Sequence, residues 1–184
     1  TMTIATPHVP RTAVPMADDD HEQIVVRQDR ETGLRFIVAV HSTVLGPSLG
    51  GMRLKRYPGG LREALEDVMG LARTMTLKAS AAGLDLGGGK SVMIDDGRPE
   101  LRDARLEAAA RVIDGLDGAY ITAEDIGTTT TDMDLMAGVT RYVVGSTGFD
   151  RRSALGRVCN YVTFMFGAAW LAPVLATRHA LVVM

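Results

Sequence analysis

The chain has 184 residues, of which 46% are hydrophobic and 23% charged, and its formal net charge is −2. This length and composition are those of one globular domain with a substantial core. The near-neutral charge gives no sign of a nucleic-acid partner or an anionic membrane surface. Cys159 is the only cysteine, and no histidine or cysteine cluster has the spacing of a zinc site. We therefore expect no metal site and a reducing, cytoplasmic location.

The N-terminal part of the chain predicts an arm, a hairpin and a loop. Residues 1–21 are rich in proline, threonine and aspartate, and we expect a flexible arm there. Two β-branched runs follow, QIVVRQ at 23–28 and RFIVAVHS at 35–42, and they predict an antiparallel hairpin. In the glycine- and proline-rich stretch LGPSLGGMR at 45–53, Gly50, Gly51 and Arg53 are interpreted either as part of a loop that contacts substrate or only as a turn.

The stretch LREALEDVMGLARTMTLK at 61–78 predicts an amphipathic helix. Its apolar residues recur at helical spacing from Leu61 to Met75, and its acidic residues, Asp67 among them, are expected on the solvated face. Lys78 lies near the end of the apolar stripe, where a lysine needs a partner or a ligand. Alternatively, the helix ends by Thr76 and Lys78 is simply exposed.

The remainder of residues 22–145 alternates short strands with helices. This order predicts an α/β domain with a mixed sheet flanked by helices. The threonines after Gly127 are candidate N-caps for a short helix. The expected strands are 91–94, 119–123 and 142–144, and the expected helices are 101–116 and 132–137.

The C-terminal tail, residues 146–184, differs in character from the domain before it. Residues 158–177, VCNYVTFMFGAAWLAPVLAT, carry no charged side chain and are long enough to span a bilayer. Asn160, Gly167 and Pro173 weaken the membrane interpretation. We expect instead an apolar helix that packs on the domain or on a second copy of the chain.

The stretch LDLGGGKSVMID, residues 84–95, places three glycines directly before a lysine. It has neither the spacing of a phosphate-binding P-loop nor a GxGxxG turn, and a strand rather than a helix follows it. We interpret the glycines as letting the backbone approach a bound molecule, with Lys90 at the lip of the strand. Glu124 and Asp125 end another predicted strand, where carboxylates are found both in active sites and as helix caps.

Four motifs together carry a family resemblance: GPSLGGMR, EALEDVMGLARTMTLK, AAGLDLGGGKSVMI and GAYITAEDIGTTTTDMD. In this order and with these separations, from Arg35 to Gly145, the chain closely resembles the catalytic, N-terminal domain of the leucine/phenylalanine/valine dehydrogenases, within the glutamate dehydrogenase superfamily. The resemblance also implies a homodimer or a larger homo-oligomer.

The resemblance implies a role for each matching residue. Lys90 would be the catalytic lysine that polarises a carbonyl or activates water, and Asp125 would shuttle a proton to the amino group. Lys78 would bind the substrate carboxylate, while Gly50, Gly51 and Met75 would line the pocket. Two ammonium groups close together would also lower each other's pKa, so that Lys90 can exchange protons.

The match fades after Gly145, and no strand–GxGxxG–helix unit follows it in this sequence. We therefore expect no NAD site in the chain, and three hypotheses remain. The favoured one is a stand-alone enzyme that binds a small amino acid, keto acid or imine and performs non-redox acid–base chemistry with Lys90 and Asp125. The second is the catalytic half of an NAD-dependent amino-acid dehydrogenase whose cofactor domain lies elsewhere. The third is a non-catalytic relic that binds a ligand.

Overall fold

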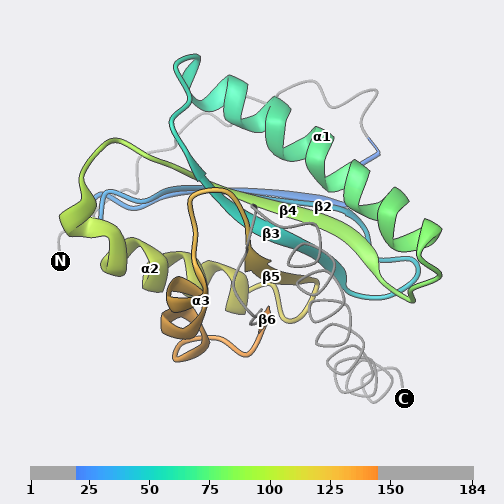
Figure 1. The fold of residues 1–184 in the computed structure, drawn as a ribbon. Helices are drawn as coiled ribbons and strands as arrows, with labels where there is room; N and C mark the ends of the chain where they lie inside the picture. The colour runs from blue at the N-terminus through green and yellow to red at the C-terminus, as the bar shows by residue number, and fades with distance from the viewer. Residues whose placement is uncertain (1–19, 145–184) are drawn as a thin grey trace, which may run out of the picture.

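A computed structural model describes residues 20–144 as a six-stranded mixed sheet with helices on both faces (Figure 1). The strand order is β1-β2-β4-β3-β5-β6. Helix α1 covers one face, and α2 and α3 lie against the other (Figure 1). The strands are β1 (Gln23–Gln28), β2 (Arg35–Ser42), β3 (Ser48–Lys55), β4 (Gly87–Ile94), β5 (Tyr120–Glu124) and β6 (Val143–Val144). The helices are α1 (Gly60–Ala81), the short 3-10 helix η1 (Pro99–Leu101), α2 (Arg102–Asp114) and α3 (Thr130–Ala137).

The sheet combines an antiparallel half with a parallel half, which confirms the predicted α/β fold. Strand β2 pairs antiparallel with β1 and with β4, so the expected hairpin is present. Strands β4, β3, β5 and β6 run parallel to one another. Helix α1 connects β3 to β4. The carboxyl ends of β3, β4 and β5 therefore share one edge of the sheet, the edge at which α/β proteins place ligands.

The expectation of a loop or a turn at residues 45–53 is wrong in one respect, because residues 48–55 form the central strand β3. This strand is hydrogen-bonded to β4 on one side and to β5 on the other. Leu49 and Met52 are buried. The strand was not predicted from the sequence, because Gly50 and Gly51 have low β-propensity. Their missing side chains are nevertheless what the tight packing around β3 requires.

Helix α1 confirms the predicted amphipathic helix and extends it to Ala81. Ala64, Val68 and Ala72 are buried and pack in a cluster with residues of β2 and β4, such as Ile37 and Val92. Because the helix continues past Thr76, the alternative in which it ends there is wrong. Lys78 is exposed in its last turn, however, as that alternative expected.

The opposite face of the sheet packs against α2 and α3 in a larger apolar cluster that includes Tyr120, Met133 and Met136. Helix α3 begins as the threonine-rich sequence predicts. The Thr129 hydroxyl accepts a hydrogen bond from the Asp132 amide, and the Asp132 carboxylate accepts one from the Thr129 amide. This capping box orients the chain that leaves β5.

Two predicted segments lie outside the described residues: nearly all of the arm, and the apolar tail at 146–184 with its 158–177 stretch. The last residue of the arm, His21, is described, and its Nε2 lies 3.0 Å from the Met69 carbonyl oxygen on α1. None of the helices between residues 20 and 144 has both the length and the apolarity needed to cross a membrane.

Candidate functional site

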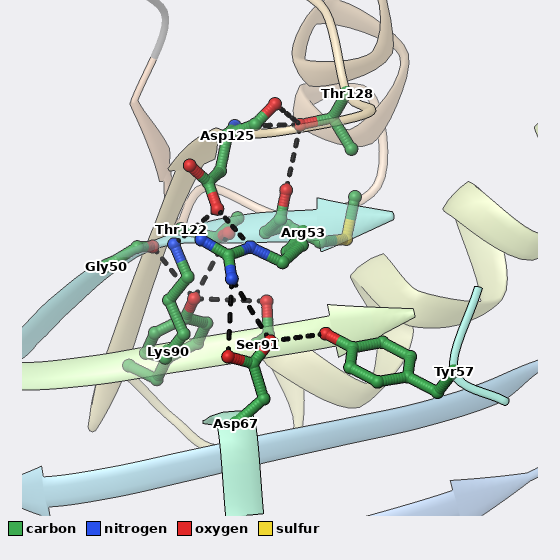
Figure 2. A network of polar contacts seen from close by, with 11 residues as sticks. Gly50, Arg53, Tyr57, Asp67, Lys90, Ser91, Thr122, Asp125 and Thr128 are labelled. Carbon is green, nitrogen blue, oxygen red and sulfur yellow. Dashed lines mark hydrogen bonds and ion pairs between the residues drawn. The ribbon is translucent and has the colours of Figure 1, made fainter. Parts of the chain in front are cut away.

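Two of the predicted site residues meet in the structure. The Lys90 ammonium donates a hydrogen bond to Asp125, with Nζ 2.7 Å from Oδ2 (Figure 2). Lys90 belongs to β4, and Asp125 directly follows β5. The Lys90 side chain is 7% exposed and that of Asp125 is 25% exposed. The pair is therefore sheltered on the lysine side and open to solvent on the carboxylate side.

Gly51 allows these two side chains to meet, because β3 lies between the strands that carry them. Val92 and Ile94 of β4 pack against α1, so side-chain alternation turns Lys90 to the same face. A Cβ atom on Gly51 would lie 2.8 Å from the Asp125 Cβ and 2.7 Å from the Glu124 carbonyl oxygen. The Asp125 Cβ and the Glu124 carbonyl group occupy the space that a side chain at Gly51 would need.

Arg53 is a third member of the site. Its Nε donates to Asp125 Oδ2 at 3.0 Å, the same oxygen that binds Lys90. Its Nη1 donates to both carboxylate oxygens of Asp67, at 3.1 and 3.4 Å (Figure 2). The motif GPSLGGMR contains Arg53, but a single arginine beside a turn gave no signal that it would join two carboxylates.

Asp67 corrects an expectation of the sequence. Helical periodicity placed it on the solvated face of α1, but its carboxylate faces the sheet, where it binds Arg53 and accepts a 2.6 Å hydrogen bond from the Tyr57 hydroxyl. Tyr57 lies in the connection between β3 and α1, and sequence reasoning missed it. An acidic residue at the edge of a helix's apolar face can point inward when a buried cation from another element lies beside it. Helical periodicity contains no information about that cation.

The electrostatics of the Lys90–Asp125 pair follow from burial and from Arg53. Burial lowers the pKa of Lys90 below its ordinary value and outweighs the opposing effect of Asp125; the positive charge of Arg53 lowers it further. Burial alone would raise the pKa of Asp125, but the Lys90 and Arg53 cations outweigh it and hold that pKa below its ordinary value. The neighbouring cation expected from the sequence was Lys78; in the structure it is Arg53.

The backbone around the pair is fixed by buried hydrogen bonds. The Thr128 hydroxyl accepts from the Asp125 amide at 2.9 Å and donates to the Met52 carbonyl at 2.8 Å, which ties the loop after β5 to β3. The Tyr120 hydroxyl donates to the Gly50 carbonyl at 2.8 Å and lies 3.1 Å from the Ser91 hydroxyl. Three strands are thereby locked next to Lys90.

The three glycines before Lys90 face protein atoms, which corrects the expectation that they make room for a bound molecule. All three lie within β4 and are buried. A Cβ on Gly88 would lie 2.0 Å from the Thr76 amide nitrogen of α1, and one on Gly89 would lie 2.7 Å from the Tyr120 ring. The glycines let helix α1 and the sheet approach β4 closely, and in this way they fix the strand that carries Lys90.

The other predicted residues are Lys78, Met75 and Gly50, and none of their side chains forms a hydrogen bond or ion pair with Lys90 or Asp125 within residues 20–144. Lys78 is exposed on α1, and its ammonium group has no hydrogen-bond or ion-pair partner within the described part of the chain. Met75 is half-buried on the same helix. Gly50 is buried, and its Cβ position lies 1.7 Å from the Gly89 carbonyl oxygen, so β4 already fills that side.

Comparison with known proteins places this geometry in a family. The model of the "Glu/Leu/Phe/Val dehydrogenase, dimerisation domain" family matches residues 21–142. The chain belongs to this family. The match spans strands β1 to β5 of the sheet, including Lys90 and the adjoining Asp125, and it confirms the resemblance that the sequence motifs indicated.

The relatives within the dehydrogenase family act on several amino acids. Leucine dehydrogenase of Thermoactinomyces intermedius is 53% identical over 126 residues, which are 68% of this chain and 34% of the relative. Valine dehydrogenase of Streptomyces virginiae is 46% identical over 125 residues, covering 68% and 35%. The crystal structure of L-tryptophan dehydrogenase from Nostoc punctiforme superposes with a TM-score of 0.65 at 35% identity, covering 70% of this chain and 37% of that one. The chain thus spans about a third of the length of these relatives.

A nicotinamide cofactor is the group that dehydrogenase relatives imply, and residues 20–144 do not fit it. A dinucleotide site needs a glycine-rich turn between a strand and the N-terminus of a helix. The glycine-rich segment here is the interior of β4, and protein atoms fill the space beside its glycines. The described residues instead offer a buried amine and a carboxylate that can exchange a proton.

Proposed function

We propose that residues 20–144 are the substrate-binding and proton-transfer part of an amino-acid dehydrogenase that interconverts an L-amino acid and its 2-oxo acid. The two-electron oxidation of the amino acid to the imine would need a nicotinamide cofactor as hydride acceptor, and that cofactor would bind outside residues 20–144. The Lys90–Asp125 pair is the observation that carries this proposal. Its amine is buried and its pKa is lowered, while its carboxylate stays ionised and reaches solvent. An amine in this setting can give up and regain a proton near neutral pH more readily than an exposed one.

The proposed chemistry assigns proton transfer to Lys90 and Asp125 and binding of the substrate carboxylate to Lys78. Lys90, in its neutral form, accepts a proton from the water that adds to the imine carbon, and in its charged form it polarises the carbonyl oxygen of the 2-oxo acid. Asp125 exchanges a proton with the substrate amino group, through the carboxylate face that solvent reaches. Lys78 is available as a fixed positive charge for the substrate carboxylate, because no group within residues 20–144 neutralises it.

The relatives support dehydrogenase chemistry rather than the stand-alone, non-redox enzyme favoured from the sequence alone. Leucine, valine and tryptophan dehydrogenases are among the similar proteins, and these three support an apolar amino acid as the substrate class. The described contacts serve proton transfer equally in both hypotheses and do not by themselves favour the non-redox one. The relic hypothesis predicts that Lys90 is dispensable for every activity.

Calorimetric titration of the full chain with the 2-oxo acids of leucine, valine and tryptophan tests the substrate class. We expect saturable binding of at least one of them, and Lys78→Ala to weaken it by roughly tenfold or more, because a charge-assisted contact to the carboxylate is lost. Arg73→Ala removes another exposed cation from the same helix and serves as the control. Equal affinities of wild type, Lys78→Ala and Lys90→Ala would overturn the proposal.

We also propose that the chain assembles as a homodimer or a larger homo-oligomer. The matching family model is that of a dimerisation domain, and a hetero-hexameric glutamate dehydrogenase from Thermus thermophilus shares the fold with a TM-score of 0.54 at 25% identity. Analytical ultracentrifugation over a range of concentrations tests this proposal. A single monomeric species at every concentration would contradict it.

A further inference from the structure

Asp125 binds two cations through one oxygen, and the two cations differ in what they can do next. Lys90 Nζ lies 2.7 Å and Arg53 Nε 3.0 Å from Oδ2, while Oδ1 takes part in neither ion pair. Lys90 is the group that must turn toward substrate or lose its proton. We propose, as an extension of the proposed function above, that Arg53 is a positioning residue that keeps the Asp125 carboxylate in place and ionised while Lys90 acts on substrate.

The position of Arg53 is fixed from both ends. Its backbone belongs to the central strand β3, and its side chain is 15% exposed. Its guanidinium binds both Asp125 and Asp67 of α1. The Tyr57 hydroxyl in turn donates a 2.6 Å hydrogen bond to Asp67 (Figure 2). A planar guanidinium with several donors can bind two carboxylates at once, whereas a single ammonium cannot do so with the same geometry.

The charges around Asp125 show why a second cation matters. Lys90 faces it from β4 and Arg53 from β3, while Asp67 on α1 is joined to it through Arg53. Tyr120 of β5 is buried, and its raised pKa keeps it neutral. The network thus holds two cations and two carboxylates. When Lys90 loses its proton, Arg53 remains as the cation of this network, and arginine does not lose its charge in proteins.

A purely structural role for Arg53 is the competing explanation. In that case Arg53 only ties β3 to α1 through Asp67, and its removal lowers stability without changing how Asp125 binds protons in the folded chain. The two explanations separate in the titration of Asp125 itself, because a positioning cation acts on the carboxylate directly. A cation at this distance typically shifts a carboxyl pKa by about 1 to 3 units.

Carboxyl 13C NMR of the full chain labelled at aspartate measures this titration, with the Asp125 signal assigned from Asp125→Asn. In Lys90→Met we expect Asp125 to remain ionised at neutral pH, because Arg53 still binds it. Adding Arg53→Gln to Lys90→Met should raise the midpoint by roughly 1 to 3 units, a tenfold or larger gain in proton affinity. Arg53→Lys in the same Lys90→Met background keeps a positive charge but lacks the several donors of the guanidinium. Its Asp125 midpoint should fall between those of the other two variants.

Arg56→Gln is the matched control, because Arg56 is 72% exposed and pairs with Asp95 rather than Asp125. It should leave the Asp125 midpoint unchanged. If Arg53→Gln does not fold, Arg53→Lys in the Lys90→Met background still decides the question. Identical Asp125 midpoints in Lys90→Met with and without the Arg53 change would overturn the proposal, as would an equal shift from Arg56→Gln.

This experiment uses no substrate, so its failure can be distinguished from failure of the proposed function. A wild-type chain that binds no 2-oxo acid but shows the expected Asp125 midpoints would contradict the proposed substrate class and support the positioning role of Arg53. A chain that binds the 2-oxo acid but whose Asp125 midpoint ignores Arg53 would support the substrate class and contradict the positioning role.

Discussion

Lys90 and Asp125 are 35 residues apart in sequence and are carried by strands that are not neighbours, yet their charged atoms lie 2.7 Å apart. The strand between them, β3, has Gly51 at the position over which the two side chains meet. Asp125 fills the space that a side chain at Gly51 would otherwise need. Gly51 thus serves the site through its lack of a side chain: the ion pair depends on an empty position in the strand between its partners.

Gly51→Ala should separate Lys90 from Asp125. The new methyl group would meet the Asp125 Cβ at 2.8 Å and the Glu124 carbonyl at 2.7 Å, contacts that require the loop after β5 to move. We expect a loss of about 1–3 kcal/mol in the free energy of unfolding, as for other overpacked positions. Urea unfolding measures this loss, and the same variant should bind the 2-oxo acid more weakly.

Gly70→Ala is the control for the Gly51 change. Gly70 lies inside α1, and a Cβ there would meet nothing within 4 Å. Alanine in a helix interior is favoured over glycine by roughly 0.5–1 kcal/mol, so this variant should be more stable than the wild type. If both alanine variants had the same stability and affinity, the crossing over Gly51 would not be what places Asp125.

Gly88→Ala should destabilise the fold more than Gly51→Ala. Its Cβ would lie 2.0 Å from the Thr76 amide nitrogen and 2.6 Å from the Ala72 carbonyl oxygen, both parts of the rigid backbone of α1. Helix and strand would have to separate along their contact. Thermal unfolding monitored by circular dichroism measures the effect. An unchanged Tm would show that the triple glycine is not there for packing.

The sequence predicted more of the fold than of the site, and particular residues show why. The hairpin, α1 and the Thr129 cap follow from local periodicity and capping preferences, which adjacent residues contain in full. Strand β3 was missed because two of its residues are glycines, whose low β-propensity outweighed the flanking apolar residues. Its strand character comes from pairing with β4 and β5, which is a tertiary property.

Within the site, Lys90 and Asp125 were predicted together only through the family motifs, because spacing does not report that a strand lies between them. Arg53, Asp67 and Tyr57 were not predicted as a network. Their signal is pairwise and long-range: Arg53 Nε reaches a residue 72 positions away, and its Nη1 reaches one 14 positions away. A helical wheel assigns Asp67 to a face of α1 from the sequence of the helix alone. The direction of its side chain depends instead on Arg53, a cation on strand β3.

Asp125 should make the stability of the chain depend on pH in the acid range. Its folded-state pKa lies below the ordinary value of 3.8, so the unfolded chain takes up a proton first as the pH falls. The stabilisation is therefore complete above about pH 5 and is lost as the pH falls below 3.8 through the folded pKa. In Asp125→Asn this part of the acid loss should disappear. Urea unfolding between pH 2.5 and 6 measures it, and parallel curves for the two proteins would contradict the assignment.

Tyr57→Phe should weaken the hold of Asp67 on Arg53 without removing any atom of the Lys90–Asp125 ion pair. The Tyr57 hydroxyl donates to Asp67 at 2.6 Å, and hydrogen bonds to charged groups contribute about 1.5–3 kcal/mol. We expect a loss of that order in the free energy of unfolding. Tyr142→Phe is the control, because its hydroxyl lies 3.4 Å from the Asp117 carboxylate and should contribute much less. Equal losses in the two variants would contradict the role given to Tyr57.

The central claim, that Lys90 and Lys78 meet an amino-acid-like substrate, has a direct test because the chain contains only three lysines: Lys55, Lys78 and Lys90. Lysine labelled with 15N at Nζ therefore gives three side-chain NMR signals, which single substitutions assign. On addition of a 2-oxo acid, the account predicts that the signals of Lys78 and Lys90 shift with one shared saturation curve while that of Lys55 stays in place. No shift at Lys90 at saturating ligand, or a shift confined to Lys55, would contradict it.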